Sequence, residues 1–370
     1  MFSRHFPLPA TVLALSVLLL PCAASADTVA SSFQPDILFH SLRHGASQIY
    51  LANSVTGEMK RLRESANEDI GAMWSPDGKK IAFVSRANGN SDIYVIDADG
   101  ANPQRLTDHP AYDGGVLWSP DGSKLAFTSG RSGSSKLYTI NADGSGLKRL
   151  TTSEAQEDEA NHAWSPDGKQ LAFVTITTNR QLSVWVTNSN GGTPEQLTKP
   201  ANANATQPVW SPDGSELAYV ESKKGRSNLR IMTLASKAVR NLTDDNFRSS
   251  RPTWTPDGSH VVFESLRAGG ARTDLFMIPS NGGEAVNLTT TPANEDMDGT
   301  VSGNGQQLAY VSFIEGKPAQ LFSLNLGNKA LKQLTQSGAL EFQPVWRPVT
   351  KAKSLAYRRA EIPAAIASLR

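Results

Sequence analysis

A five-residue motif, Trp-Ser-Pro-Asp-Gly, recurs along this chain at an almost fixed interval and restricts the fold more than any other feature. Full copies begin at Trp74, Trp118, Trp164 and Trp210, and variants begin at Trp254, Val301 and Trp346. The intervals between successive copies are 44, 46, 46, 44, 47 and 45 residues. A repeat of this length is typical of one four-stranded blade of a β-propeller. We therefore expect one repeat domain rather than the two domains that 370 residues alone would suggest.

Each repeat shows the same succession of strand and turn signals. The first residue of the motif ends the first strand, and Pro-Asp-Gly then forms a turn, because Pro fixes φ and Gly accepts a positive φ. In the first complete repeat, the apolar runs at residues 81–83 and 93–96 are the expected second and third strands, and Leu106 marks the fourth. Continuous apolar runs are typical of strands that are buried on both faces, as in stacked blades.

The number of strands predicts the number of blades. Six complete units run from Trp74 to Leu334. Residues 37–39, residues 49–51 and Leu62 supply strands two to four of another unit, and residues 343–346 supply its first strand. The prediction is an all-β fold: a single seven-bladed β-propeller of four-stranded blades, its ring closed by strands from both termini, which leaves no open edge. Residues 355–357 compete with residues 37–39 for one strand of the closing blade, and the sequence does not decide between them.

The N-terminus predicts export. One Arg precedes a mostly apolar run at residues 8–20, and Ala24-Ser25-Ala26 offers a cleavage site before Asp27. The run is too short for a transmembrane helix. We expect a periplasmic protein, with secretion as the alternative, and no disulfide after processing, because the only cysteine is Cys22. The expected parts are a signal peptide (1–26), a linker (27–36), the propeller (37–357) and a tail (358–370).

The charge balance restricts the classes of partner. The chain has 36 Lys and Arg residues against 35 Asp and Glu residues. Such a balance argues against nonspecific binding to nucleic acids or to membrane surfaces. We expect a protein or peptide partner, no nucleic acid, no membrane insertion and a monomeric chain.

The complete repeat resembles a known family. Trp-Ser-Pro-Asp-Gly-x-x-Ile/Leu-Ala-Phe is followed by Ser-x-Arg-x-Asn/Ser-Gly, by Ile-Tyr-x-Ile-Asp-x-Asp-Gly and by a terminal Leu-Thr. This pattern resembles the TolB-type propeller repeat over roughly residues 37–357. The resemblance implies a periplasmic envelope protein that binds protein partners through its propeller. TolB proteins have an α/β domain before a six-bladed propeller, whereas here about ten residues lie between the expected cleavage site and the first strand, and seven blades are counted.

Acidic residues recur five positions before the motif. Asp69, Asp113, Glu159, Asp296 and Glu341 stand there, and the two remaining blades have Ala205 and Ser249. Carboxylate oxygens are suitable ligands for a divalent cation such as Ca²⁺, so these acids are candidate metal ligands. The alternative, which we favour, is pairing with the basic residues of the loops between strands two and three, namely Arg43, Arg86, Arg131, Arg180, Arg226, Arg267 and Lys317. No resident cofactor is expected.

Residues that break the repeat pattern are candidates for ligand binding. His162 is the only titratable residue two positions before the motif. Three positions before the motif stand Asn161, Gln207, Arg251 and Asp298, and the last two carry opposite charges. These five residues predict a ligand site at the mouth of the propeller channel, between His162 and Asp298. The alternatives are a histidine packed between blades and an ion pair between Arg251 and Asp298.

The sequence contains no recognisable catalytic motif. No nucleophile, base and orienting group can be assembled by spacing, and there is no phosphate-binding glycine loop, zinc cluster or Gly-x-Ser-x-Gly elbow of the kind that prolyl-oligopeptidase-like enzymes carry beyond similar repeats. The favoured hypothesis is a non-catalytic binding or scaffold propeller that presents its channel-mouth face to a protein or peptide of the cell envelope. The alternative is an enzyme acting on oligosaccharides, like the polysaccharide lyases built on similar propellers, with His162, Arg251 and Asp298 at its site.

Overall fold

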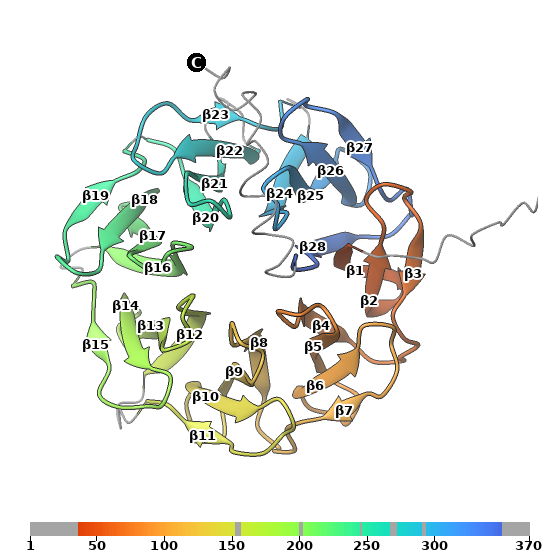
Figure 1. Cartoon of the computed structure of the whole chain (residues 1–370), viewed down its shortest axis with the longest axis horizontal. Coiled ribbons are helices and arrows are strands. Elements are labelled where there is room, and N and C mark those ends of the chain that lie inside the picture. The colour runs from red at the N-terminus through yellow and green to blue at the C-terminus, as the bar shows by residue number, and fades with distance from the viewer. Residues whose placement is uncertain are drawn as a thin grey trace, which may run out of the picture. The chain divides into compact units, whose positions relative to one another are not determined.

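Seven four-stranded antiparallel sheets form the blades of a ring (Figure 1). The computed structural model describes residues 36–349, apart from 152–156, 200–202, 245, 267–271 and 291–293. Every regular element of these residues is a strand. The described part of the chain contains no helix with the length and hydropathy needed to cross a membrane. The predicted all-β, seven-bladed propeller is confirmed.

Blades 1 to 6 follow one another along the chain. Blade 1 comprises β4 (Asp69–Trp74), β5 (Lys80–Ser85), β6 (Asp92–Asp97) and β7 (Gln104–Arg105). Blade 2 comprises β8 (Asp113–Trp118), β9 (Lys124–Ser129), β10 (Lys136–Asn141) and β11 (Lys148–Arg149). Blade 3 comprises β12 (Asp158–Trp164), β13 (Gln170–Ile176), β14 (Leu182–Asn188) and β15 (Glu195–Gln196). Blade 4 comprises β16 (Asn204–Trp210), β17 (Glu216–Lys223), β18 (Arg226–Thr233) and β19 (Val239–Asn241). Blade 5 comprises β20 (Ser249–Trp254), β21 (His260–Ser265), β22 (Asp274–Pro279) and β23 (Val286–Asn287). Blade 6 comprises β24 (Asn294–Val301), β25 (Gln307–Ile314), β26 (Gln320–Asn325) and β27 (Leu331–Gln333).

The closing blade joins the two ends of the propeller. It consists of β28 (Glu341–Trp346), β1 (Ile37–His44), β2 (Ala46–Ala52) and β3 (Met59–Arg61). Strand β28 pairs antiparallel with β1, so that Ile37 lies opposite Trp346. Strand β1 therefore occupies the second-strand position for which the sequence offered two candidates. The other candidate, residues 355–357, lies outside the described residues, as do the predicted signal peptide and tail.

In blades 1 to 6 the repeated motif forms the turn that connects the first strand to the second, and one set of hydrogen bonds holds this turn. In blade 1 the hydroxyl group of Ser75 donates to the carboxylate of Asp77 at 2.7 Å and accepts the N–H of Lys80 at 2.9 Å. Asp77 also accepts the N–H of Lys79, and Gly78 has a φ of 67°. The hydrogen bond from Ser75 is the main cause that lowers the pKa of Asp77. In blades 2 to 4, Asp121, Asp167 and Asp213 show the same lowering for the same reason.

The tryptophans of the motif connect neighbouring blades. Each indole N–H donates to a main-chain carbonyl oxygen on the first strand of the preceding blade: Trp118 to Met73 (3.3 Å), Trp164 to Leu117 (3.3 Å), Trp210 to Ala163 (3.1 Å), Trp254 to Val209 (3.2 Å) and Trp346 to Thr300 (2.9 Å). Trp74, at the junction with the closing blade, differs. Its buried indole nitrogen has no hydrogen-bond partner among the described residues, and the guanidinium group of Arg347 lies 5.0 Å from its ring.

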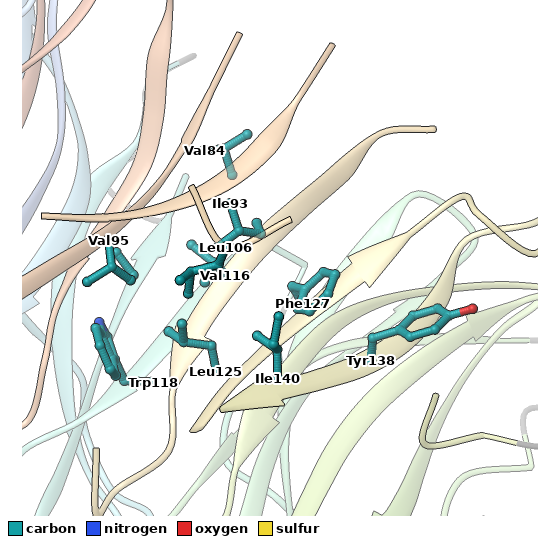
Figure 2. Packing of buried hydrophobic residues seen from close by; sticks show 11 residues of the cluster. Val84, Ile93, Val95, Leu106, Val116, Trp118, Leu125, Phe127, Tyr138 and Ile140 are labelled. Carbon is teal, nitrogen blue, oxygen red and sulfur yellow. The ribbon is translucent and has the colours of Figure 1, made fainter. Parts of the chain in front are cut away.

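The hydrophobic core lies between blades rather than within one. Figure 2 shows one such layer, in which Val84, Ile93, Val95 and Leu106 of blade 1 meet Val116, Trp118, Leu125, Phe127, Tyr138 and Ile140 of blade 2. Equivalent layers join blades 2 to 6 in sequence, and blade 6 to the closing blade. A blade therefore buries both of its apolar faces only when it has a neighbour on each side.

Strand order also decides where the connections lie. The start of β4 pairs with the end of β5, Asp69 lying opposite Ser85. In every blade, the end of strand two, the start of strand three and the end of strand four consequently lie at the face of the ring where strand one begins. We call this face the loop face. The Trp-Ser-Pro-Asp-Gly turns lie at the opposite face.

Replacing Trp254 by Phe should destabilise the protein more than replacing Trp74 by Phe. Both substitutions remove a similar volume, but only the first leaves a main-chain carbonyl, that of Val209, without its donor. We expect the free energy of unfolding to differ by about 1–2 kcal/mol between the two variants. Urea denaturation followed by circular dichroism measures this difference, and equal losses would contradict the assigned role of the indole N–H.

The turn aspartates should make the protein sensitive to acid. Because the folded state lowers the pKa of Asp121, its contribution to stability is present above the unfolded pKa of about 3.9 and is lost as the pH falls through the lower folded value. Asp121→Asn should therefore reduce the loss of stability between about pH 5 and pH 2. Asn304 already makes the equivalent turn in blade 6, accepting the Ser302 hydroxyl at 2.6 Å, so the substitution should leave the turn intact. Urea midpoints measured over this pH range test the prediction, and an unchanged pH dependence would contradict it.

Candidate binding site at the inner strands

The first strand of each blade lies nearest the centre of the ring (Figure 1) and carries a bulge at the same place. In blades 1 to 6 the register between the first and second strands shifts at the same place. The shift lies between the residue four positions before the last residue of the first strand and the residue one position before it, which in blade 1 are Ile70 and Met73. One residue in each bulge has a positive φ: Gly71 (61°), Gly115 (66°), Asn161 (47°), Gln207 (53°), Arg251 (50°), Asp298 (57°) and Gln343 (50°). The predicted candidates Asn161, Gln207, Arg251 and Asp298 thus all occupy one backbone position.

The backbone conformation of the bulges has an energetic cost where the residue is not glycine. A left-handed conformation costs an ordinary residue about 1–2 kcal/mol. Strained residues of this kind are tolerated only where surrounding contacts hold them, and they cluster at functional sites. Five non-glycine residues carry this cost around the inner strands.

In blades 4 to 6, side chains of one blade bind the bulge amides of the next. The amide oxygen of Gln207 accepts the backbone N–H of Arg251 at 2.7 Å. Glu264 Oε1 accepts the N–H of Asp298 at 2.8 Å, and Asp298 Oδ2 accepts the N–H of Gln343 at 3.1 Å. These hydrogen bonds satisfy amides that the bulge removes from the sheet ladder.

The charged members of this group form one ion-pair cluster. The guanidinium group of Arg251 pairs with the carboxylate of Asp298 and lies 3.5 Å from that of Glu264. The side chain of Arg251 is 52% exposed, whereas those of Asp298 and Glu264 are 12% and 9% exposed. Burial raises the pKa of Glu264, and the charge of Arg251 opposes this rise. The predicted pairing of Arg251 with Asp298 is therefore present.

Glu264 was missed in the sequence because only first-strand positions were compared. It follows the aromatic residue of the second strand, where five blades have Val or Thr and the closing blade has His40. His40 also contacts the first strand of the next blade, where its Nε2 accepts the N–H of Ala72, the residue after the bulge residue Gly71, at 3.2 Å. Burial lowers the pKa of His40 to about 4. Comparing second strands would have identified both polar residues.

His162 lies apart from the ion-pair cluster. It is buried, with 8% of its surface exposed, and its ring lies beside Gly115 of blade 2. Burial lowers its pKa to about 4, and its Nε2 has no hydrogen-bond partner among the described residues. No described contact joins His162 or Asn161 to Arg251 or Asp298, so the structure brings together only part of the predicted set.

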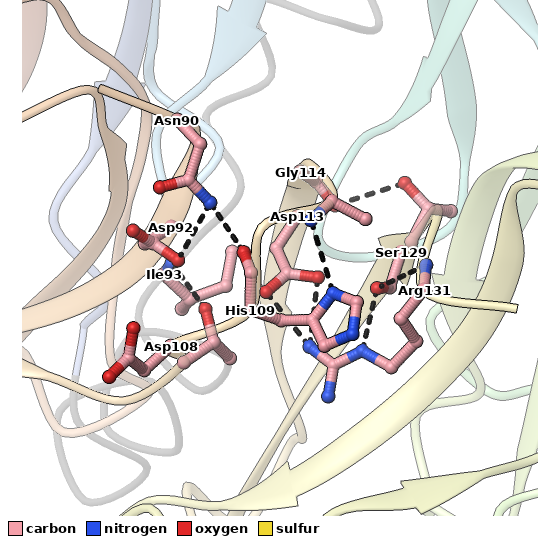
Figure 3. Close-up of polar contacts among 12 residues, drawn as sticks. Asn90, Asp92, Ile93, Asp108, His109, Asp113, Gly114, Ser129 and Arg131 are labelled. Carbon is pink, nitrogen blue, oxygen red and sulfur yellow. Dashed lines mark hydrogen bonds and ion pairs between the residues drawn. The ribbon is translucent and has the colours of Figure 1, made fainter. Parts of the chain in front are cut away.

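The acids at the start of the first strands are buried and mostly paired with cations. Arg131 binds Asp113 at 2.9 Å (Figure 3), and Arg43 binds Glu341 at 2.7 Å, as the favoured pairing with the loop basic residues requires. Asp69 instead pairs with Arg63 at 2.9 Å, and Glu159 lies 3.7 Å from Lys136. Arg86 pairs with Glu68, and Arg267 lies outside the described residues. Asp296 is also fully buried.

These acids do not gather into one site. Within the ranges that the structure describes, no three His, Cys, Asp or Glu side chains come close enough together to hold a metal ion. Each of the four paired acids interacts with the cation of its own blade or of the blade beside it.

Comparison with known proteins identifies the repeat. The family model described as the TolB beta propeller domain matches residues 29–206 and 161–360, which together exceed half of the chain. No curated protein sequence matches the chain.

Solved structures with similar folds have different functions. TolB from Acinetobacter baumannii is similar with a TM-score of 0.56 and 18% identity, over 82% of this chain and 79% of that one. An oligogalacturonate lyase in complex with manganese has a TM-score of 0.64 and 18% identity, over 81% and 86%. A puromycin-hydrolyzing peptidase from Mycobacterium tuberculosis has a TM-score of 0.67 and 15% identity, over 80% of this chain and 50% of the peptidase. At these identities the similarity establishes the fold alone.

Replacing Arg251 by Met should destabilise the protein at neutral pH. The substitution leaves the buried carboxylate of Glu264 without its cation, and we expect a loss of about 1–2 kcal/mol, because Arg251 is half exposed. A raised pKa means that Glu264 favours the folded state below its unfolded pKa of about 4.3, and that this contribution is lost as the pH rises through the folded pKa. The loss caused by Arg251→Met should therefore shrink as the pH falls.

The double variant Arg251→Met, Glu264→Gln is the matched control. It removes the carboxylate together with its cation, so its stability should depend less on pH than that of Arg251→Met. Urea denaturation at pH 7 and at about pH 4 compares the variants. Parallel pH profiles for the single and double variants would contradict the proposed coupling.

Proposed function

We propose that this chain, which belongs to the TolB β-propeller domain family, is an exported binding propeller that presents its loop face to a protein or peptide of the cell envelope. The match to the family model confirms the resemblance found in the repeat. Export to the periplasm rests on the predicted signal peptide at residues 1–26, and we propose the mature chain as the active form.

One observation carries this proposal. The polar side chains of the inner strands in blades 4 to 6 are bonded to one another and to the backbone of the next blade. Arg251 is held by two carboxylates yet remains half exposed, so it offers oriented hydrogen-bond donors on the inner strand β20, in the half of that strand nearer the loop face. Preorganised donors on a rigid ring are suited to recognition, because little conformational entropy is lost on binding.

Capture from envelope extract tests the proposal. The mature chain is immobilised, captured proteins are crosslinked, and the crosslinked residues are mapped. We expect crosslinks on the loop face and loss of capture in Arg251→Met, Glu264→Gln, which removes the exposed cation together with the buried carboxylate that it neutralises. Lys169→Met removes one cation at a turn of the opposite face and should capture normally. Crosslinks on the opposite face, or equal capture by both variants, would overturn the proposal.

Oligosaccharide cleavage is the second candidate function. Its support is the similarity to an oligogalacturonate lyase, of which the match covers 86%, together with an arginine and a raised-pKa carboxyl group side by side at the loop face. A lyase would release an unsaturated uronate that absorbs ultraviolet light. Incubation with oligogalacturonate, with and without Mn²⁺, tests this candidate. Absence of any such product under both conditions would end it.

A further inference from the structure

The hairpin between β17 and β18 in blade 4 extends farther than its counterparts in blades 1, 2 and 5. Both strands have eight residues, compared with six in β5 and β6 of blade 1. Lys224 and Gly225 make the turn with φ values of 50° and 79°, as a tight two-residue hairpin requires. The Nε–H of Arg248 donates to the carbonyl oxygen of Gly225 at 3.2 Å. The hairpin tip therefore projects from the loop face and is held by the hydrogen bond from Arg248.

One face of this hairpin lines a cleft. In the register of the two strands, Lys223 lies opposite Arg226, Glu221 opposite Asn228 and Tyr219 opposite Arg230. These six residues share one face, because alternate residues of a strand point to the same side. Tyr219 packs in the layer between blades 3 and 4, so this face is turned toward blade 3. The cleft has a volume of about 340 Å³ and is lined by Glu221, Lys223, Lys224, Arg226, Asn228 and Arg230.

The single carboxylate of the cleft is already occupied. Glu221 Oε2 accepts hydrogen bonds from Nε and Nη2 of Arg230, at 3.1 and 2.9 Å. The remaining donor of that guanidinium group, Nη1, binds the carbonyl oxygen of Thr243 at 3.1 Å. Arg230 is therefore held in place by three hydrogen bonds, and Glu221 pairs with Arg230 rather than with Lys223 or Arg226.

Arg226 lacks the acid that neutralises its counterpart in blade 2. There Arg131, in the equivalent loop, binds Asp113 at the start of the first strand. In blade 4 the residue at the position of Asp113 is Ala205. No described residue forms an ion pair with Lys223 or Arg226, and the two lie directly opposite each other. Like charges at directly opposed positions destabilise a hairpin, and a bound anion would relieve this repulsion.

We propose that this cleft binds an acidic peptide segment in an extended conformation, with its carboxylates against Lys223, Lys224 and Arg226. The proposal rests on the proposed function and specifies the chemistry of the partner. The paired Glu221 beside the cations disfavours a dense anion such as polyphosphate, and the balanced charge of the whole chain disfavours nucleic acid. Carboxylates at alternate positions of an extended peptide lie on one side, so that several of them can face the cations grouped at the hairpin tip.

Fluorescence anisotropy with defined peptides tests this assignment on the full mature chain. The probe is a fluorescein-labelled ten-residue peptide of alternating Glu and Ser, and the matched probe has Gln in place of Glu. We expect the Glu peptide alone to bind, and its affinity to fall with added salt. Lys223→Ser, Arg226→Ser should weaken binding at least tenfold. Lys317→Ser, in the equivalent loop of blade 6, should leave binding unchanged.

The other outcomes overturn the assignment. These are equal binding of the two peptides, unchanged binding by the double variant, and displacement of the peptide by inorganic phosphate or oligogalacturonate at lower concentrations than unlabelled Glu peptide.

The double variant should be at least as stable as the wild type, because it removes a like-charge pair, and its thermal midpoint excludes misfolding as a cause of weaker binding. If the double variant still captures the envelope partner, the cleft assignment fails while the binding function stands. If the wild type captures nothing, the binding function itself fails.

Discussion

The contact between neighbouring blades is the interaction on which this propeller depends. A single four-stranded blade has two apolar faces and no means of covering them alone. The indole of Trp210 illustrates how the contact is oriented, because its ring packs between blades 3 and 4 while its N–H binds the carbonyl oxygen of Ala163. Apolar burial supplies most of the stabilisation, and the directional hydrogen bond fixes how one blade is placed against the next.

The bulges of the inner strands are the feature of this ring on which the proposed binding function rests. Each bulge removes a backbone amide from its ladder, and in blade 5, blade 6 and the closing blade a side chain of the preceding blade takes up the hydrogen bond. Two of these three side chains, Glu264 and Asp298, carry charge, so that in the proposed function structural support and ligand recognition would involve the same groups. Arg251 is the clearest case, since it is held by Asp298 and Glu264 and is still half exposed.

The sequence predicted the fold more completely than the site. Blade number, the strand-ending tryptophans and the closing of the ring all follow from local signals that repeat seven times, so errors in one copy are corrected by the others. The pairing of Arg251 with Asp298 was one of two alternatives and could be stated because both residues break the same repeat position. Glu264 was missed because it lies on a second strand and contacts the bulge of the next blade, and the sequence comparison covered first-strand positions alone. The separation of His162 from the cluster depends on the rotation between blades, which no local pattern encodes.

The closing blade has a consequence for how the protein folds. Ile37 pairs with Trp346, so the chain must form a loop of roughly 300 residues before this blade exists. Because loop entropy grows only logarithmically, closure over this length costs about 2 kcal/mol more than closure over one blade. Closure is slow, however, because contacts between residues that are distant in the sequence form late in folding. Until β28 pairs with β1, the six consecutive blades form an open arc with one uncovered apolar face at each end. Exposed apolar surface and unpaired strand edges favour aggregation, and the pairing of the two ends of the propeller removes both.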